Sequence, residues 1–264
     1  MKPLRNDCFA LPPGVNWTPV NEALDRLRQR LHPVVEQDAS LPLAQACGYV
    51  LAQDQHAPRA HPPSSNSAVD GYAMAGPISD VPLQMPLVEG RSAAGVPYAG
   101  TVPAGHAIRI LTGAVMPAGT DTVVLEEDVE VIDGQLHIRG TLKQGANRRL
   151  AGEDIQVQDI IIKAGRLLTP TDISVLASVG IESVPVYRKL RVGVLSTGDE
   201  VKPVGATVTD WQIYDANRPM LSALIAGLGY QVVDLGHAMD SADAVRQALT
   251  QGAQRCDVIL TSGG

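Results

Sequence analysis

The sequence predicts a multidomain protein that combines α+β and α/β folds. Residues 57–149 hold short apolar stretches interrupted by Gly and Pro, a pattern typical of a β-rich domain. From residue 190 onward, apolar runs of strand length alternate with helix-length segments, which indicates a parallel sheet with right-handed crossovers. The 25 glycines and 19 prolines among 264 residues argue against a helical bundle.

These changes in pattern divide the chain into four segments. An N-terminal helical and linker segment covers residues 1–58, and a β-rich domain covers 59–148. Residues 149–189 return to the linker domain, so the β-rich domain is inserted in it. Residues 190–264 form an α/β domain that ends on its third strand. A half-built sheet leaves an unpaired edge, so we expect this domain to be incomplete and the chain to be truncated.

The linker segments are expected to contain helices. Thr18 or Asn21 could cap the first, Pro33 would end it, and its apolar residues recur at helical spacing: Val20, Leu24, Leu27 and Leu31. A second short helix is expected over residues 42–51, where Ala and Leu dominate. In the return segment, a strand over 159–163 precedes a helix over 172–178. The sequence Thr169-Pro170-Thr171 signals the start of that helix, and Gly180 its end.

The β-rich domain is expected to contain strands at its apolar stretches: 81–88, 105–111, 121–129 and 136–138. Between the last two, Asp133-Gly134 predicts a hairpin turn.

The C-terminal domain begins with a continuous aliphatic run at 190–195, which is expected of a strand buried on both faces. Ser241 is expected to cap the second helix of this domain. The remaining elements are expected in this order: a helix over 217–228, a strand over 230–235, a helix over 241–253 and a strand over 257–260.

Composition excludes several classes of protein. The formal net charge of -7 makes nucleic-acid binding through a broad basic face a poor hypothesis. Cys8, Cys47 and Cys256 are too few and too far apart for a disulfide framework or a zinc site. The N-terminus lacks the apolar stretch of a signal peptide, and no run approaches the ~18 apolar residues of a membrane span. We therefore expect a cytoplasmic protein that does not enter a membrane.

Ligands of open parallel sheets bind outside the carboxyl ends of the strands, where this sequence places three polar loops. The loops are residues 196–200, 236–240 and 261–264. Their Gly, Ser and Thr residues could present N–H and hydroxyl groups to an anion. Asp199, Glu200 and Asp240 could hold Mg²⁺ through carboxylate oxygens. Each loop could equally be a plain turn or a helix cap.

Three earlier loops are also dense in polar groups. They cover residues 62–74, 109–117 and 147–155, and each could instead be an ordinary turn or a solvated ion pair. His56 and His61 lack a convincing third ligand nearby, so a metal role for them is not expected.

Together these pieces resemble the MoeA family, whose eukaryotic relatives include the E domain of gephyrin. Two departures stand out. Ser64 and Ser65 occupy positions where the family commonly has an aromatic residue and an acid, and the family continues beyond the TSGG motif. Six motifs carry the resemblance, in the family's order and spacing: SNSAVDGYAM (65–74), RILTGAVMPAGTDTVV (109–124), NRRLAGEDI (147–155), LRVGVLSTGDEV (190–201), QIYDANRPML (212–221) and ILTSGG (259–264).

The resemblance implies a MogA-like α/β domain that binds adenylylated molybdopterin. It implies a Mg²⁺-dependent step in which molybdate is transferred to the dithiolene sulfurs and AMP is released. It also implies an elongated homodimer and a transient contact with a MogA-like adenylyltransferase. The loops at Asp70, Thr112 and Asp154 are expected to face the α/β domain of the partner subunit.

Residue roles follow from the same resemblance. Glu200 and Asp240 are expected to serve the metal and phosphate chemistry, and Asp70 and Thr112 to position substrate or metal-bound water. Arg149 would pair with phosphate or molybdate, with Asp154 holding the arginine. The remaining residues would bind the pterin or its phosphate: Ser196, Thr197, Gly198, Ser262 and Gly263.

Three other interpretations remain open. The first is a gephyrin-type protein that binds molybdopterin and acts as a scaffold. The second is an adenylyltransferase of the MogA type, although such proteins are a single α/β domain without the β-rich segment. The third is a fragment that is inactive because its sheet is unfinished. The sequence does not separate molybdenum from tungsten.

Overall fold

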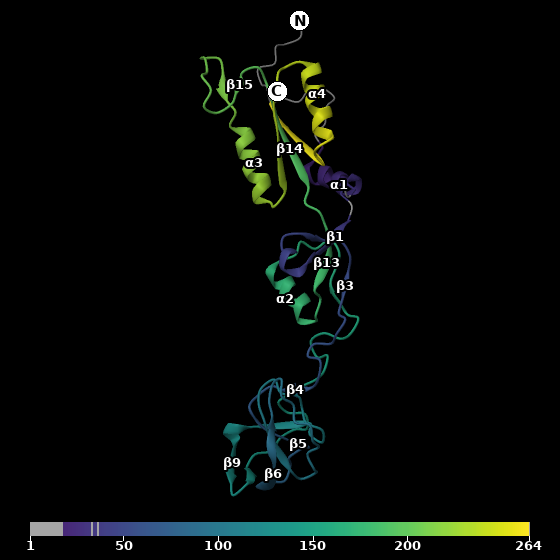
Figure 1. The fold of residues 1–264 in the computed structure, drawn as a ribbon, viewed down its shortest axis with the longest axis vertical. Coiled ribbons are helices and arrows are strands. Elements are labelled where there is room, and N and C mark those ends of the chain that lie inside the picture. The colour runs from purple at the N-terminus through teal and green to yellow at the C-terminus, as the bar shows by residue number, and fades with distance from the viewer. Residues whose placement is uncertain (1–17, 33, 36, 264) are drawn as a thin grey trace. The chain divides into compact units, whose positions relative to one another are not determined.

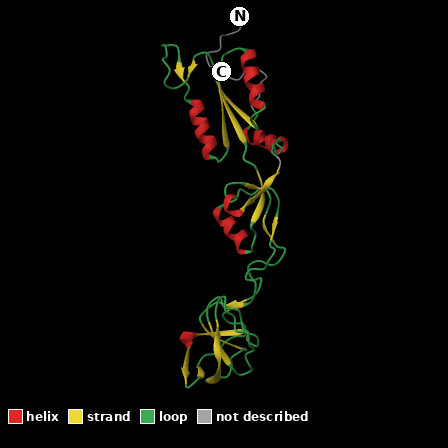
Figure 2. Cartoon of the chain, in the orientation of Figure 1, coloured by secondary structure: helices red, strands yellow, loops and turns green. Residues whose placement is uncertain are grey.

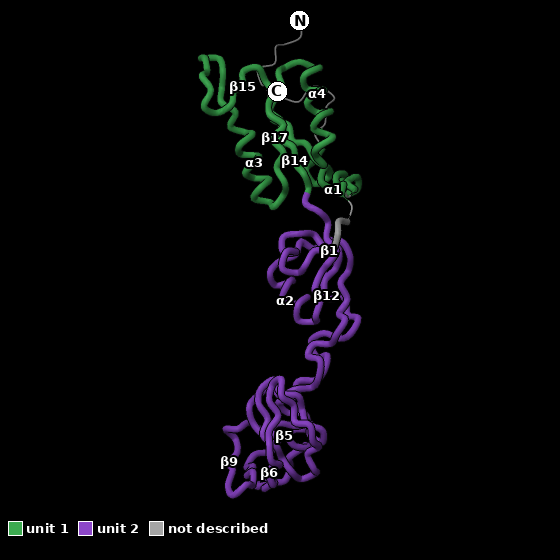
Figure 3. Tube along the Cα trace, viewed as in Figure 1, with its two compact units in different colours: residues 1–36, 190–264 green, residues 37–189 purple. Residues whose placement is uncertain are grey.

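The structure is a computed structural model, and it describes residues 18–32, 34, 35 and 37–263. Cys8 and the loop expected before residue 18 lie outside this range. The chain divides into two compact units, one of residues 37–189 and the other of residues 1–36 with 190–264 (Figure 3). The mixed α+β and α/β fold class is confirmed, whereas the four-segment division remains a prediction.

The unit of residues 37–189 contains a three-stranded antiparallel sheet in the order β1-β13-β2. The strands are β1 (Gln37–Pro42), β13 (Ser183–Tyr187) and β2 (Val50–Leu51). Helix α2 (Pro170–Ser178) contributes to the core of this sheet through Leu176, which is fully buried with Leu51 and Val184. The expected helix after Thr169-Pro170-Thr171 is therefore confirmed.

The helix expected over residues 42–51 is wrong. The segment forms the end of β1, a 3₁₀ turn η1 (Leu43–Gln45) and β2. Its backbone groups bond to distant residues instead: the N–H of Gly48 donates to the carbonyl of Leu168, and that of Leu51 to the carbonyl of Arg166. Gly48 has a φ of 79°, which a helix interior does not allow. Tertiary pairing has overridden the local helix preference of Ala and Leu.

A six-stranded sheet in the order β8-β5-β7-β6-β10-β9 forms the β-rich part of the same unit. All its pairs are antiparallel except β6 with β7. Alternate residues of β5 enter different apolar clusters, Tyr72 and Met74 one and Ala73 the other, so both faces of this strand are buried. The strands are β5 (Gly71–Met74), β6 (Leu83–Ser92), β7 (Ala107–Ile110), β8 (Thr122–Leu125), β9 (Val129–Ile132) and β10 (Gln135–Ile138).

Two short connections complete this unit. β9 and β10 join through Asp133 and Gly134, whose φ angles of 51° and 77° confirm the expected hairpin turn. A 3₁₀ turn, η2 (Glu126–Asp128), lies between β8 and β9. Two two-stranded ladders hold segments that are far apart in sequence. They pair β3 (Gln55–His56) with β12 (Ile160–Ile162), and β4 (Asn66–Ser67) with β11 (Arg148–Arg149).

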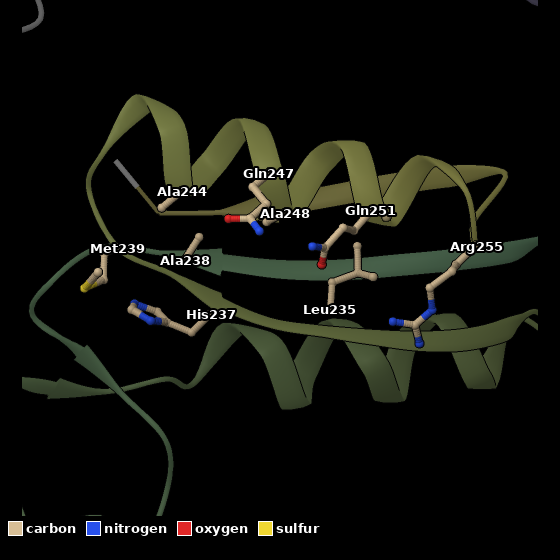
Figure 4. A pocket seen from close by; sticks show the side chains of 10 residues that line it. Leu235, His237, Ala238, Met239, Ala244, Gln247, Ala248, Gln251 and Arg255 are labelled. Atoms are coloured by element: carbon tan, nitrogen blue, oxygen red, sulfur yellow. The ribbon is translucent and has the colours of Figure 1, made fainter.

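The second unit contains a three-stranded parallel sheet in the order β17-β14-β18. Its helices α3 and α4 lie on opposite faces of the sheet (Figures 1 and 4). The expected strand–helix alternation is confirmed, as is the Ser241 cap of α4, whose hydroxyl accepts from the N–H of Ala244 at 3.2 Å. The elements are β14 (Arg191–Thr197), α3 (Asn217–Gly227), β17 (Gln231–Ala238), α4 (Ala242–Ala253) and β18 (Val258–Ser262).

Two smaller features belong to the second unit. β15 (Val201–Lys202) and β16 (Ile213–Tyr214) pair within the long loop between β14 and α3 (Figure 2). Helix α1 (Val20–Arg30) confirms the first expected helix, but its N-cap is Pro19, without a side-chain cap, so the caps proposed at Thr18 and Asn21 are wrong. Among the described residues, no helix is long and apolar enough to cross a bilayer.

The start of α2 yields a prediction about stability and pH. The carboxylate of Asp172 accepts from the Nε of Arg166 at 3.0 Å and from the N–H of Thr169 at 2.8 Å. The bond from Arg166 is the largest cause that lowers the pKa of Asp172 to about 2. Because this lies below the unfolded value of about 3.9, the charged carboxylate stabilises the fold above that pH and loses this effect as the pH falls toward 2.

Asp172→Asn should therefore lower the free energy of unfolding by about 1 kcal/mol at pH 7, the usual size of a capping interaction, because Asp172 completes the capping box of Thr169, the N-cap of α2. Urea unfolding at pH 7 and pH 3 measures the difference from wild type, which should shrink at the lower pH. Glu182→Gln, at an exposed position in the same unit, serves as the control. An equal loss at both pH values would contradict the role of the charge.

Candidate functional site

The predicted site residues fall into two clusters, one in each unit. The first, called here the Asp70 cluster, comprises Asn66, Asp70, Thr112, Arg149 and Asp154. The second, called the strand-end cluster, comprises Ser196, Thr197, Gly198, Glu200, Asp240, Ser262 and Gly263. Each is described separately.

Asp70 fixes the turn that carries Thr112. Its Oδ1 accepts from the hydroxyl of Thr112 at 2.6 Å and from the N–H of Thr112 at 2.7 Å. These bonds, the hydroxyl first, lower the pKa of Asp70. Both residues are exposed, and Oδ2 of Asp70 has no hydrogen-bond partner among the described residues. The pair therefore presents an ionised oxygen to solvent from a fixed backbone.

Arg149 lies in an ion-pair arrangement of its own loop. Its guanidinium contacts Oδ2 of Asp154 at 2.5 Å and Oε1 of Glu153 at 3.3 Å. The bond from Asp154 is the largest cause that raises the pKa of Arg149. The side chain is 37% exposed, so this ion pair orients the arginine and leaves part of its surface open to a ligand.

Short strand pairing brings these two groups together. Arg149 of β11 lies opposite Asn66 of β4, and Asn66 also forms a bridge to Val115. The N–H of Gly113, next to Thr112, donates to the carbonyl of Ser67. The loops that carry Asp70, Thr112 and Arg149 are thus joined through β4.

Asn66 was noted in the sequence as one polar residue of its loop, but it was given no role. Its Oδ1 and the Nε of Arg148 are the buried side-chain atoms without a hydrogen-bond partner in the described part of the chain. A buried polar atom left unbonded costs about 1–3 kcal/mol, so these atoms mark a place for a water or ligand group. No sequence signal could have found this, since it depends on how two short strands pair.

The strand-end cluster lies at the carboxyl ends of the three parallel strands. Ser196 pairs with His237 of β17 and with Ser262 of β18. The loops beyond are connected by hydrogen bonds. The N–H of Asp240 donates to Oδ1 of Asp199 at 3.1 Å, and Nδ2 of Asn217 donates to the hydroxyl of Ser262 at 2.7 Å. The structure thus brings the predicted residues of this unit to one edge of the sheet.

Two glycines of this cluster are required by the close approach of their neighbours. Gly198 has a φ of 126° and Gly263 a φ of 128°, both in the range that disfavours other residues. A Cβ on Gly263 would lie 2.2 Å from the backbone oxygen of Thr197, and one on Gly198 would lie 2.7 Å from Oε2 of Glu200. Both glycines therefore allow the loops to pack closely, and Gly198 itself is buried.

Ser196 is buried, with 2% of its surface exposed, and its hydroxyl donates to Oδ2 of Asp215 at 2.6 Å. Asp215 is also buried, which by itself would raise its pKa. Hydrogen bonds from Ser196 and the N–H of Arg218, with the charges of Arg218 and His237, outweigh burial and lower the pKa of Asp215. Sequence reasoning quoted Asp215 within a motif without giving it a role.

His237 is a further residue that the sequence did not indicate. Its Nε2 lies 2.5 Å from the carbonyl oxygen of Gly198, and because a carbonyl only accepts, Nε2 must carry the proton. Beside it, a pocket of about 390 Å³ runs between β17 and α4, lined by His237, Met239, Gln247 and Gln251 among others (Figure 4).

No group of three or more His, Cys, Asp or Glu side chains suited to a metal occurs within residues 18–32, 34, 35 and 37–263. A cation at Glu200 and Asp240 would therefore need oxygen atoms from a ligand or from water, which is how Mg²⁺ is usually held.

A parallel sheet with helices on both faces, whose strands end together in loops rich in Gly and Ser, defines an α/β protein of the doubly wound class, and ligands of this class bind at that edge. Comparison with known families refines this. The model described as "MoeA N-terminal region (domain I and II)" matches residues 18–180, and the one described as "Probable molybdopterin binding domain" matches residues 193–264. The chain belongs to the MoeA family.

Individual relatives agree. The molybdopterin molybdenumtransferase of Haemophilus influenzae is 38% identical over 247 residues, which cover 93% of this chain and 60% of the relative. Molybdopterin molybdenumtransferase 2 of Mycobacterium tuberculosis is 34% identical over 85% of this chain and 56% of its own length. A molybdopterin biosynthesis MoeA protein of Pyrococcus horikoshii superposes with a TM-score of 0.81 at 27% identity, covering 94% of this chain and 67% of that one. The chain thus spans about 60% of the length of the Haemophilus relative.

Replacement of Gly263 gives a test of the strand-end geometry that needs no ligand. Gly263→Ala should lower the melting temperature measurably, because its Cβ would collide with the backbone of Thr197 and its φ is strained. Gly227→Ala, a helical position with open space around it, should leave the melting temperature unchanged or slightly higher. Equal melting temperatures for Gly263→Ala and wild type would show that the two loops are not this close.

Proposed function

We propose that the protein acts as a molybdopterin molybdenumtransferase, which inserts molybdate into adenylylated molybdopterin and releases AMP. The observation that carries this proposal is the strand-end cluster, where glycine-containing loops follow neighbouring strands at one edge of a parallel sheet and carry the carboxylates Glu200 and Asp240. Such an edge suits a phosphorylated ligand. The names of the curated relatives support the choice of molybdopterin as that ligand.

Charge explains why two kinds of site are needed. Molybdate and adenylylated molybdopterin are both anions, and the protein has a formal net charge of -7. Positive charge must therefore be supplied locally. Arg149 is the residue of the Asp70 cluster that would bind molybdate or phosphate. Its ion pairs with Asp154 and Glu153 fix the orientation of its guanidinium before a ligand binds.

In the strand-end cluster, Thr197, Ser262 and Gly263 would bind the pterin or its phosphate through hydroxyl or backbone N–H groups. Gly198, whose N–H donates to the carbonyl of Ala238, would contribute to this site by shaping the turn. Ser196 would act from beneath this surface, since its hydroxyl is buried and bonded to Asp215. In the Asp70 cluster, the free oxygen of Asp70 and the hydroxyl of Thr112 would position substrate or a water molecule. The unbonded Oδ1 of Asn66 is a further acceptor beside them.

Glu200 and Asp240 would hold Mg²⁺. Two carboxylates completed by phosphate oxygens and water fit this ion, which rarely takes an all-protein cage. When bound, Mg²⁺ would neutralise phosphate charge and polarise a phosphoryl oxygen. Asp199 fixes the N–H of Asp240 and so the start of the loop that carries that carboxylate.

We also propose that the protein is a homodimer, in which the Asp70 cluster of one copy faces the α/β domain of the other. A transient contact with a MogA-like adenylyltransferase would deliver the adenylylated substrate without its release into solution.

The test of function is to supply purified protein with adenylylated molybdopterin, Mg²⁺ and molybdate, and to measure pterin binding and AMP release. Wild type should release AMP, and Glu200→Ala should lose that activity by about 100-fold or more while staying folded. Glu130→Ala, an exposed carboxylate paired with Arg139, is the matched control and should keep wild-type activity. If wild type binds the pterin but releases no AMP, the proposal that this chain is an enzyme fails, and a binding or scaffold role or an inactive fragment replaces it.

Coexpression of two inactive variants tests the dimer. Asp70→Ala and Glu200→Ala should each be inactive alone, but a mixed dimer would hold one site with both wild-type residues and should regain AMP release. Activity is measured on mixed dimers purified through two different affinity tags. No recovery in such a mixed dimer would refute a site shared between copies.

A further inference from the structure

A chain of buried and half-buried polar groups lies directly beneath the strand-end cluster. At its centre is Asp215, whose side chain is 5% exposed. Its Oδ2 accepts from the hydroxyl of Ser196 at 2.6 Å, and its Oδ1 accepts from the N–H of Arg218 at 3.0 Å. One carboxylate therefore joins the end of β14 to the beginning of α3.

Arg218 extends this connection to the neighbouring strand. Its Nε lies 3.2 Å from Oδ2 of Asp215, and its Nη1 lies 3.2 Å from Oδ1 of Asp234 on β17. Asp234 in turn accepts from the N–H of Gly236 at 2.8 Å. Asn217, which precedes Arg218, donates to Ser262 at the end of β18. The segment of residues 215–218 thus contacts all three parallel strands.

Ser196 is poorly placed to touch a ligand itself. It is almost fully buried, it pairs on one side with His237 and on the other with Ser262, and its hydroxyl proton is committed to Asp215. It is also the last residue but one of β14, which ends at Thr197 directly before the loop that carries Gly198 and Glu200. Whatever holds Ser196 therefore sets where that loop begins.

We propose that Asp215 is a positioning residue for the strand-end site, which fixes Ser196 and the start of α3 so that the ligand loops are in place before the ligand binds. Ser196 acts through Asp215 and does not contact the ligand. This inference rests on the proposed function for the identity of the ligand, adenylylated molybdopterin. Fixing the loops in advance raises affinity because less ordering is left to occur on binding.

The chain offers a matched control at the other end of the same strand. Asp257 is equally buried, with a side-chain exposure of 6%, and also pairs with an arginine, since Oδ1 lies 2.9 Å from the guanidinium of Arg191. Arg191 begins β14, whereas Ser196 stands near its end. Asp257→Asn should therefore cost stability as Asp215→Asn does, without reaching the ligand loops.

The first readout needs no ligand. Hydrogen exchange followed by mass spectrometry should show the amides of residues 197–201 exchanging about ten-fold faster or more in Asp215→Asn than in wild type. Those amides include Gly198 and Val201, which donate to the carbonyls of Ala238 and Gly198. Asp257→Asn should leave exchange in 197–201 at the wild-type rate. Unchanged exchange in Asp215→Asn would overturn the inference whether or not the protein binds the pterin.

The second readout is affinity. Asp215→Asn should weaken binding of adenylylated molybdopterin by about ten-fold or more, while Asp257→Asn with a similar loss of melting temperature should bind as wild type does. Equal affinity losses in both variants would mean that the effect is one of general stability, and the positioning role would be rejected. If the wild-type protein does not bind the pterin, the proposed function is refuted but the positioning role of Asp215 is not, because the hydrogen-exchange result does not depend on the ligand.

A double-mutant cycle separates an indirect role of Ser196 from a direct one. Ser196→Ala should weaken binding on its own, but should add little in the Asp215→Asn background, because both changes break the same bond. Additive losses would show that the hydroxyl of Ser196 touches the ligand directly, contrary to the inference.

Discussion

The second unit depends on β14, a strand that is buried on both faces and paired on both edges. Five consecutive residues, 192–196, are buried, and each end of the strand is fixed by a buried aspartate, Asp257 at the beginning and Asp215 near the end. Such a strand offers no side chain to a ligand along its length. Polar side chains and backbone groups become accessible to a ligand only beyond the last paired residues of β14. The neighbouring strands β17 and β18 end at the same place. This constraint concentrates the candidate ligand groups at one edge of the sheet.

One arginine in each unit is held by two carboxylates before any ligand binds. Arg149 and Arg218 each contact two carboxylates within the described residues, so neither long side chain has to be ordered when a ligand arrives. Arg149 retains enough exposure to add a ligand to its contacts, whereas Arg218 is 21% exposed and serves the framework beneath the loops. One residue type thus has two uses, and the degree of burial distinguishes them.

The Asp70 cluster is built by a different principle. It rests on loops, which are joined by two-residue strands and by single hydrogen bonds from side chains to backbone. Two hydrogen bonds from Thr112 to Asp70 and the short ladder between β4 and β11 take the place of the regular pairing that a sheet would supply. Functional groups carried on loops need such local fixation, since the loop backbone lacks other restraints.

The sequence by itself determined the fold class, the alternation of strand and helix after residue 190, the Asp133-Gly134 hairpin, the helix start at Thr169-Pro170-Thr171 and the Ser241 cap, because each depends on local periodicity or turn chemistry. Its motifs also identified the loops that carry both candidate clusters, although the roles of their residues remain predictions. The tertiary structure alone decided that residues 42–51 do not form the expected helix, because the hydrogen-bond partners of the Leu43, Gly48 and Leu51 N–H groups lie more than a hundred residues away. It alone revealed Asp215, His237 and the unbonded Asn66 oxygen. Burial and pairing of this kind arise from contacts between distant segments, and residue type and spacing along the chain do not encode them in any local pattern.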